Sequence, residues 1–177
     1  MSDKREYTIE DVQREAESHQ KSKEQSELMQ LIIFKLAGEE YGLSIDQIKE
    51  VVLTPRVAKM PQTPSYIKGV ANIRGSIIAI MDLEQKFGLG EGLAEEEKQN
   101  YTLVVENLAF KIGILVKEVP NTLTIEVDEI DKASSLIQYS SLDASCLMGV
   151  VNVGDRMIIL IDMIKLIESE GVKTSYP

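Results

Sequence analysis

Apolar residues in this chain gather in short runs that recur at regular spacing. The stretch GVANIRGSIIAIMDL at 69–83 aligns without a gap with GVVNVGDRMIILIDM at 149–163, at an offset of 80 positions. Each stretch predicts a strand, a two-residue turn that contains glycine, and a longer apolar strand that ends at an aspartate. Because identical or apolar residues match at every position outside the turn at 74–76, the pattern indicates a duplicated structural unit.

A second match lies upstream of each copy, at a different offset. LIIFKL at 31–36 aligns with TLVVEN at 102–107, and GLSIDQI at 42–48 aligns with GILVKEV at 113–119, both at an offset of 71 positions. The offset between the two copies increases from 71 to 80 positions, which predicts nine additional residues in the second copy, within the segment at 128–143. Loops accept insertions at low cost, so this segment is expected to be a loop.

These matches predict an all-β fold with short helices, in which two five-stranded SH3-like barrels pack together. Units this small bury too little surface to be stable alone, so the two barrels should share an apolar seam. The expected division is a charged flexible tail at 1–27, a first barrel at 28–98 and a second barrel with a C-terminal helix at 99–177, the two barrels forming one domain. Within the tail, Thr8 and Asp11 have the spacing of a capping box that opens a helix.

Composition narrows the possible partners. Apolar residues make up 44% of the chain, which supports a packed core, and the lone Cys146 excludes an internal disulfide and fits a reducing compartment. The longest apolar runs are too short to cross a bilayer, so a cytoplasmic protein with no membrane insertion is expected. A net charge of −10 disfavours nucleic acids and anionic membranes, which leaves proteins as the expected partners.

Residues for enzyme chemistry are missing from the expected barrels. The single histidine, His19, lies in the tail, so neither a catalytic triad nor a histidine metal cluster can form in the barrels. Cys146 then lacks an activating partner and is expected to be a small buried residue. Asp82 and Asp162 stand in duplicate at strand ends, which favours capping over acid–base catalysis. The sequence predicts a binding module without metal or cofactor.

The stretches LIIFKLAGEEYGLSIDQIKEVV, PSYIKGVANIRGSIIAIMDLEQKFG, KIGILVKEV and LMGVVNVGDRMIILIDMIKLI resemble the CheW family of bacterial chemotaxis coupling proteins, from about residue 28 to residue 168. The resemblance implies two SH3-like barrels and a non-enzymatic scaffold. Its implied partners are the helical hairpin at the cytoplasmic tip of a chemoreceptor and the regulatory domain of the chemotaxis histidine kinase CheA. The free protein is expected to be a monomer.

The resemblance also implies site residues. The receptor hairpin would lie in an apolar groove between the barrels, and Arg74, in an arginine–glycine turn, would contribute to an interface. Kinase contacts are expected at the barrel ends, without assigned residues. By position, the groove would be lined by apolar side chains with a polar rim: Ile32, Ile45, Ile48, Val51 and Val119, with Lys49 and Glu50 at the rim.

Three other functions compete with this hypothesis. One is a small-barrel protein that binds oligonucleotides; aromatic residues at 5%, no tryptophan and the net acidity count against it. Another is an enzyme acting on a small molecule, which would need a deep pocket with converging polar groups. The last is a CheW-like scaffold that serves a signalling array outside chemotaxis.

Overall fold

The computed structural model describes residues 8–23, 26–89, 100–132 and 146–170. Its helical segments are α1 (Ile9–Lys23), η1 (Ile45–Gln47), α2 (Leu83–Lys86), η2 (Val127–Glu129) and α4 (Met163–Ser169). Its strands are β1 (Leu28–Leu36), β2 (Glu39–Ser44), β3 (Ile48–Leu53), β4 (Ile67–Ile73), β5 (Ser76–Met81), β6 (Tyr101–Glu106), β7 (Lys111–Val116), β8 (Asn121–Glu126), β9 (Leu147–Val153) and β10 (Arg156–Ile161).

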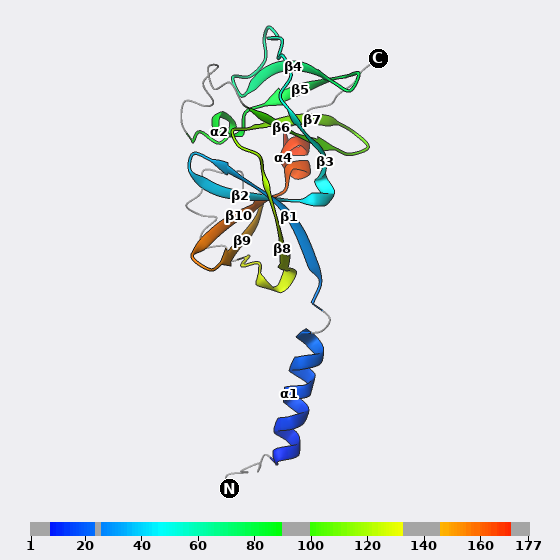
Figure 1. Cartoon of the computed structure of the whole chain (residues 1–177), viewed down its shortest axis with the longest axis vertical. Coiled ribbons are helices and arrows are strands. Elements are labelled where there is room, and N and C mark those ends of the chain that lie inside the picture. The colour runs from blue at the N-terminus through cyan, green and yellow to red at the C-terminus, as the bar shows by residue number, and fades with distance from the viewer. Residues whose placement is uncertain (1–7, 24–25, 90–99, 133–145, 171–177) are drawn as a thin grey trace.

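The strands form two five-stranded sheets, which confirms the predicted fold class. Sheet A has the order β8-β1-β2-β10-β9, and sheet B has the order β3-β6-β7-β5-β4. The two orders are equivalent when each strand of the first half is matched to its counterpart in the second half. Figure 1 shows sheet B in the upper part of the body, sheet A below it, and α4 between them.

The expected boundary at residue 98 is not where the barrels divide. Sheet B is built from 48–116, whereas sheet A combines β1 and β2 with β8, β9 and β10 from the end of the chain. Parallel pairing of β10 with β2, and of β5 with β7, joins the two halves of the sequence within each sheet. Barrel A therefore takes β1 and β2 from the first copy of the repeat and its other three strands from the second copy. Barrel B takes β6 and β7 from the second copy and its other three strands from the first.

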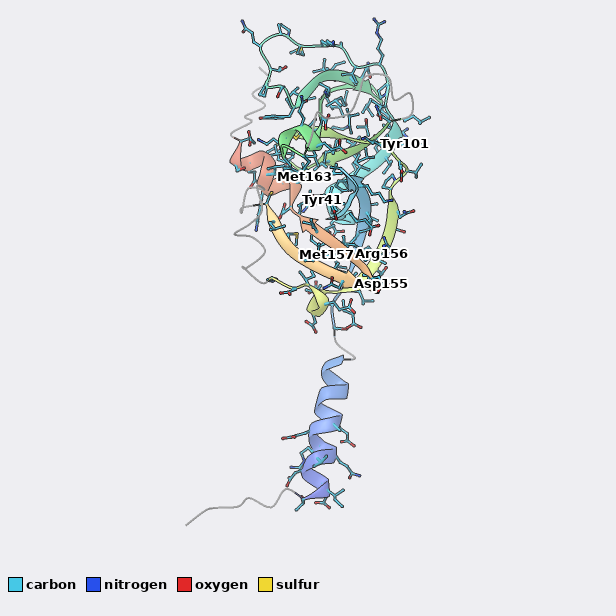
Figure 2. All side chains as sticks on the ribbon, turned by 90° about the vertical axis from the view of Figure 1, so that its left-hand side faces the viewer. Tyr41, Tyr101, Asp155, Arg156, Met157 and Met163 are labelled. Carbon is cyan, nitrogen blue, oxygen red and sulfur yellow. The ribbon has the colours of Figure 1, made fainter. Side chains whose placement is uncertain are left out.

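The inner strands of each sheet are buried on both faces over most of their length, and this explains the unbroken apolar runs. One face of each sheet fills its own barrel, and the other face meets the opposite sheet in a shared core. In β1, for example, Leu31 and Ile33 point into barrel A while Ile32 and Phe34 belong to the shared core. A strand buried on both faces needs apolar residues at consecutive positions and not at alternate ones. Tyr41 and Met163 lie in the middle of the body, between the sheets (Figure 2).

A short bridge closes each barrel. In sheet B the N–H of Ala58 donates to the carbonyl of Val70 at 2.8 Å, and the N–H of Val70 donates back at 2.9 Å. Asp131 and Val150 make the same pair of bonds in sheet A, at 2.8 and 2.9 Å. These bridges connect the segments that follow β3 and β8 to the edge strands β4 and β9, so they limit the exposed edges of the sheets.

The two predicted tight turns are present. Arg74 and Gly75 join β4 to β5 with φ values of 50° and 84°, and Gly154 takes a φ of 61° in the β9–β10 turn. Positive φ at the central positions matches the twist of a two-residue hairpin. Arg74 is an uncommon residue for this conformation, because its side chain makes the left-handed region unfavourable.

The N-terminal segment forms a helix that projects away from the body (Figure 1). The predicted capping box is confirmed: the N–H of Thr8 donates to Asp11 Oδ2 at 3.2 Å, and the N–H of Asp11 donates to Thr8 Oγ1 at 3.4 Å. The side chain of His19, and residues 133–143 of the segment predicted to hold the insertion, lie outside the described residues.

The two repeated aspartates cap short helices, as predicted. Asp82 Oδ1 accepts from the N–H of Gln85 at 3.3 Å, and Asp162 Oδ1 accepts from the N–H of Lys165 at 3.1 Å.

The side chain of Gln47 donates to Asp162 Oδ1 at 3.2 Å and accepts from the N–H of Met163 at 3.0 Å. Gln47 thus fastens the segment before β3 to the start of α4, a contact that the sequence did not predict.

The residue that follows α4, Glu170, is held by Tyr66, which precedes β4, and by Lys86 in α2. Tyr66 donates from its hydroxyl to Glu170 Oε2 at 2.9 Å, and Lys86 pairs with the other oxygen of Glu170 while lying 4.3 Å from the centre of the Tyr66 ring. Burial, together with the bond to the Glu170 carboxylate, raises the pKa of Tyr66 above its ordinary value. The helix that follows sheet A in the sequence is therefore anchored at its end to residues that flank the β4–β5 hairpin of sheet B.

Candidate protein-binding site

The shared core reaches the surface along β3. Side chains of β3 alternate between partly buried and exposed positions, and an exposed row contains Val51 at 38% and Leu53 at 67% exposure. Their cross-strand partners on β6 are Leu103, which is fully buried in the shared core, and Tyr101, which packs against it. Directly opposed residues point to the same face of a sheet, so Val51 and Leu53 continue the shared core outward.

Two more predicted groove residues lie next to this row. Ile45, in η1, and Ile48, at the start of β3, are both partly buried and pack against the shared core. Ile45 also lines a cavity of about 420 Å³ together with Leu28, Met29 and Thr124. Ile45 and Ile48 pack against the shared core, and Val51 and Leu53 lie on the face of β3 that continues it. We call these four residues the strip; Leu53 and its cross-strand neighbour Tyr101 were not predicted from the sequence. Alternation along a strand could have identified Leu53, but the offset that a bulge introduces between Ile48 and Glu50 obscured the pattern.

Two other groove candidates lie elsewhere. Ile32 is 7% exposed inside the shared core, so it offers little surface to a partner and we leave it out of the strip. Val119, which is 60% exposed between β7 and β8, lines a separate cavity of about 250 Å³ with Phe34, Glu40 and Arg156. That cavity shares no lining residue with the cavity beside Ile45.

Glu50 and Arg74 form an ion pair on the other face of β3. Glu50 is opposite Val104, which packs inside barrel B, so its side chain does not share the face of Val51. Its Oε2 accepts from Arg74 Nε at 2.5 Å, while its Oε1 is buried without a hydrogen-bond partner among the described residues. Arg74 is 75% exposed, so it covers a largely buried carboxylate from outside. Glu50 therefore supports the β4–β5 turn and is not part of the rim of the strip. The rim residue that remains is Lys49, paired with Glu106 at 3.0 Å.

A second exposed apolar surface lies at the end of sheet B. Ile77 on β5 is 54% exposed, and Leu108 in the β6–β7 turn is fully exposed. Asn107 shapes that turn, because its Oδ1 accepts from the N–H groups of Ala109 and Phe110, each at 2.8 Å. Ile77, Leu108 and Phe110 line a shallow cavity of about 370 Å³. Phe110 is only 8% exposed, so we call the two exposed residues, Ile77 and Leu108, the hairpin-end surface.

The matching end of sheet A is more polar. Met157, the counterpart of Ile77, is 46% exposed beside Arg156, and both lie near the end of the β9–β10 hairpin (Figure 2). Arg156 makes a two-bond ion pair with Glu40, at 2.7 and 2.9 Å. The guanidinium lowers the pKa of Glu40 below its ordinary value of 4.5.

This ion pair predicts a pH-dependent contribution to stability. Because the folded-state pKa of Glu40 is lowered, the pair stabilises the folded protein above pH 4.5 and this contribution disappears as the pH falls below that value. Urea unfolding should show Glu40→Gln less stable than wild type at pH 7, with the difference shrinking steadily toward pH 3. Glu39→Gln, at an exposed neighbour outside the pair, is the control. A Glu40→Gln difference that stays constant across this range would contradict the assignment.

In the part of the chain that the structure describes, the exposed large apolar side chains are aliphatic and not aromatic. Among the described residues, the large exposed apolar side chains are isoleucine, valine, leucine and methionine. Proteins that bind single-stranded nucleic acid stack bases on exposed aromatic rings, so this surface does not support the oligonucleotide hypothesis. The described helices include none that is long and apolar enough to span a membrane.

Comparisons with known proteins agree with this architecture. A model of the CheW-like domain matches residues 30–171. The chain is similar to the chemotaxis protein CheW of Klebsiella aerogenes, with 35% identity over 142 residues that cover 80% of this chain and 82% of the relative. It is also similar to the chemotaxis protein CheW of Treponema pallidum, with 29% identity over 83% of this chain and 86% of the relative.

A solved structure has the same fold. The crystal structure of the scaffolding protein TtCheW from Thermoanaerobacter tengcongensis superimposes with a TM-score of 0.67 and 32% sequence identity, over 77% of this chain and 86% of that one. The family model covers far more than half of the chain, and the relatives match over most of their length. The chain therefore belongs to the CheW family.

Proposed function

We propose that this protein is a non-enzymatic chemotaxis adaptor that binds the helical hairpin at a chemoreceptor tip and the regulatory domain of the histidine kinase CheA at the same time. The observation that carries the proposal is that the molecule has two separate exposed apolar surfaces. One is the strip formed by Ile45, Ile48, Val51 and Leu53, and the other is the hairpin-end surface of Ile77 and Leu108.

The strip suits the receptor hairpin. An amphipathic helix binds in an apolar trough with a polar margin, and here the Lys49–Glu106 ion pair supplies that margin at one end of β3. The apolar residues sit on a strand and a turn anchored to the shared core, so little ordering is needed before a partner binds.

The hairpin-end surface suits the kinase domain. Contacts between similar barrels are expected at barrel ends, and Leu108 is held outward there by the Asn107 turn. Leu108 is fully exposed and Ile77 is 54% exposed. Burying both against another protein removes a large apolar area from water, which makes binding more favourable.

Two substitutions should separate the two contacts. Val51→Asp should weaken binding to the receptor hairpin at least thirtyfold, since covering an unpaired carboxylate costs about 2 kcal/mol or more. Leu108→Asp should weaken binding to the kinase domain by a similar factor. Isothermal titration calorimetry with each isolated partner measures both effects.

Each variant is the control for the other. Val51→Asp should bind the kinase domain as wild type does, and Leu108→Asp should bind the receptor hairpin as wild type does, which also shows that both variants are folded. If the wild-type protein binds neither partner, or if one substitution abolishes both contacts in a folded protein, the proposal of two separate surfaces is wrong.

A further inference from the structure

Between its described strands, the chain passes from one sheet to the other twice. The first crossing runs from β2 in sheet A through η1 to β3 in sheet B, and the second runs from β7 in sheet B through residues 117–120 to β8 in sheet A. The first crossing contacts the start of α4, and the second contacts α2. The two crossings are counterparts in the repeat, as are the two helices, so these contacts can be compared directly.

At the first crossing, the side chain of Gln47 uses both ends of its amide. Nε2 donates to Asp162 Oδ1 at 3.2 Å, and Oε1 accepts from the N–H of Met163 at 3.0 Å. The same Asp162 oxygen caps α4 by accepting from the N–H of Lys165 at 3.1 Å. Gln47 is partly buried, and Met163 is fully buried in the shared core next to it. An amide that is bonded at its donor and at its acceptor keeps one orientation, so it fixes the crossing to α4 (Figure 1).

The contact at the second crossing is looser. Lys117 Nζ lies 3.7 Å from Glu84 Oε2, and the Lys117 side chain is 42% exposed. The other oxygen of Glu84 accepts from the N–H of Ala37 at 2.8 Å. An ion pair with an exposed lysine is screened by water and holds its position weakly. The two crossings therefore differ in how firmly they are attached to the neighbouring helix.

We infer that Gln47 is a positioning residue, which holds the first crossing in the conformation that receptor binding requires. This inference rests on the proposed function. Gln47 lies between Ile45 and Ile48, two residues of the strip, and the N–H of Ile48 donates to the carbonyl of Ile45 across the three residues of η1. In so short a turn, attaching Gln47 to α4 also fixes its neighbours, which removes part of the ordering cost of binding.

Two substitutions separate the two bonds of Gln47. Gln47→Glu keeps an acceptor for Met163 but places a carboxylate against Asp162, so the crossing should detach from α4. Gln47→Lys keeps a donor, and its bond to the Asp162 carboxylate is charge-assisted. By titration calorimetry, Gln47→Glu should bind the receptor-tip helical hairpin at least fivefold more weakly than wild type, and Gln47→Lys should bind it within twofold. Both variants should bind the kinase regulatory domain within twofold of wild type.

Hydrogen exchange measures the crossing itself and needs no partner. The N–H of Ile48 is bonded across η1, and the N–H of Met163 is bonded to Gln47. In Gln47→Glu, exchange at these two amides should be at least tenfold faster than in wild type, because the crossing opens locally. Exchange within β6 and β7, in the middle of sheet B, should not change.

The matched control is Lys117→Met, which breaks the contact at the second crossing and should bind the receptor hairpin within twofold of wild type. Lys117 lines a cavity of about 170 Å³ that shares no lining residue with the cavity beside Ile45. If Gln47→Glu weakens both partners equally, Gln47 supports only the fold, and the inference is wrong. It is also wrong if Lys117→Met weakens receptor binding as much as Gln47→Glu does. If wild type does not bind the hairpin, the proposed function has failed, and unchanged exchange at Ile48 would then refute the role of Gln47 separately.

Discussion

Replacing Gly69 with alanine is expected to destabilise the protein by about 3–5 kcal/mol, in the range of severe core substitutions. Gly69 has a φ of 145°, and a Cβ built on it would lie 2.1 Å from the carbonyl oxygen of Ala58. That oxygen accepts the hydrogen bond from Val70 that helps to close barrel B. The backbone must therefore move, and the closing bridge is lost with it.

Gly75→Ala is the matched control for this prediction. Gly75 also has a positive φ, 84°, but nothing lies within 4 Å of a Cβ placed there. The substitution Gly75→Ala should therefore lower the free energy of unfolding only by the cost of a left-handed backbone conformation, about 1–2 kcal/mol. Urea unfolding of both variants separates the clash from the strain. If Gly69→Ala is no less stable than Gly75→Ala, the close approach to Ala58 is not a constraint on the fold.

Dividing the chain after residue 98 is expected to leave neither piece able to fold alone. In the piece 1–98, β3 has lost β6, which is its pairing strand in sheet B, and β1 and β2 have lost β8 and β10. Both pieces should lack a cooperative thermal transition by circular dichroism. Mixing them should restore one, because the parallel pairs β5–β7 and β10–β2 join the two pieces.

A fragment spanning 46–117 is the comparison for this experiment. It contains all five strands of sheet B and should show more strand signal than the piece 1–98, although its side of the shared core is exposed. A cooperative transition in the piece 1–98 alone would show that the repeat unit, and not the interleaved barrel, is the folding unit.

The candidate site shows what sequence reasoning can place and where it stops. Ile45, Ile48 and Val51 are close in the sequence, on one turn and the strand that follows it. Ile32 and Val119 were expected beside them, but one is buried in the shared core and the other lines a different cavity. The sequence of one inner strand cannot reveal which of its apolar residues face the other sheet, since both faces of the inner strands are buried.

Glu50 illustrates the same limit. Its position beside Ile48 and Val51 favoured a place at the rim of a groove, but a bulge and the alternation of the strand turn it toward Arg74, 24 positions along the chain. Contacts between residues that are distant in the sequence depend on which strands pair and in which register, and the local sequence does not specify this pairing.

What the sequence determined by itself was local and repetitive: the tight turns at Gly75 and Gly154, the aspartate caps of α2 and α4, the capping box of α1 and the equivalence of the two halves. These features depend on interactions between residues a few positions apart. The tertiary structure alone decided that β1 and β2 leave their own repeat to pair with β8 and β10. The two copies carry nearly the same apolar pattern, so pairing within one copy or between copies satisfies each strand equally well, and the connections and the shared core select between them.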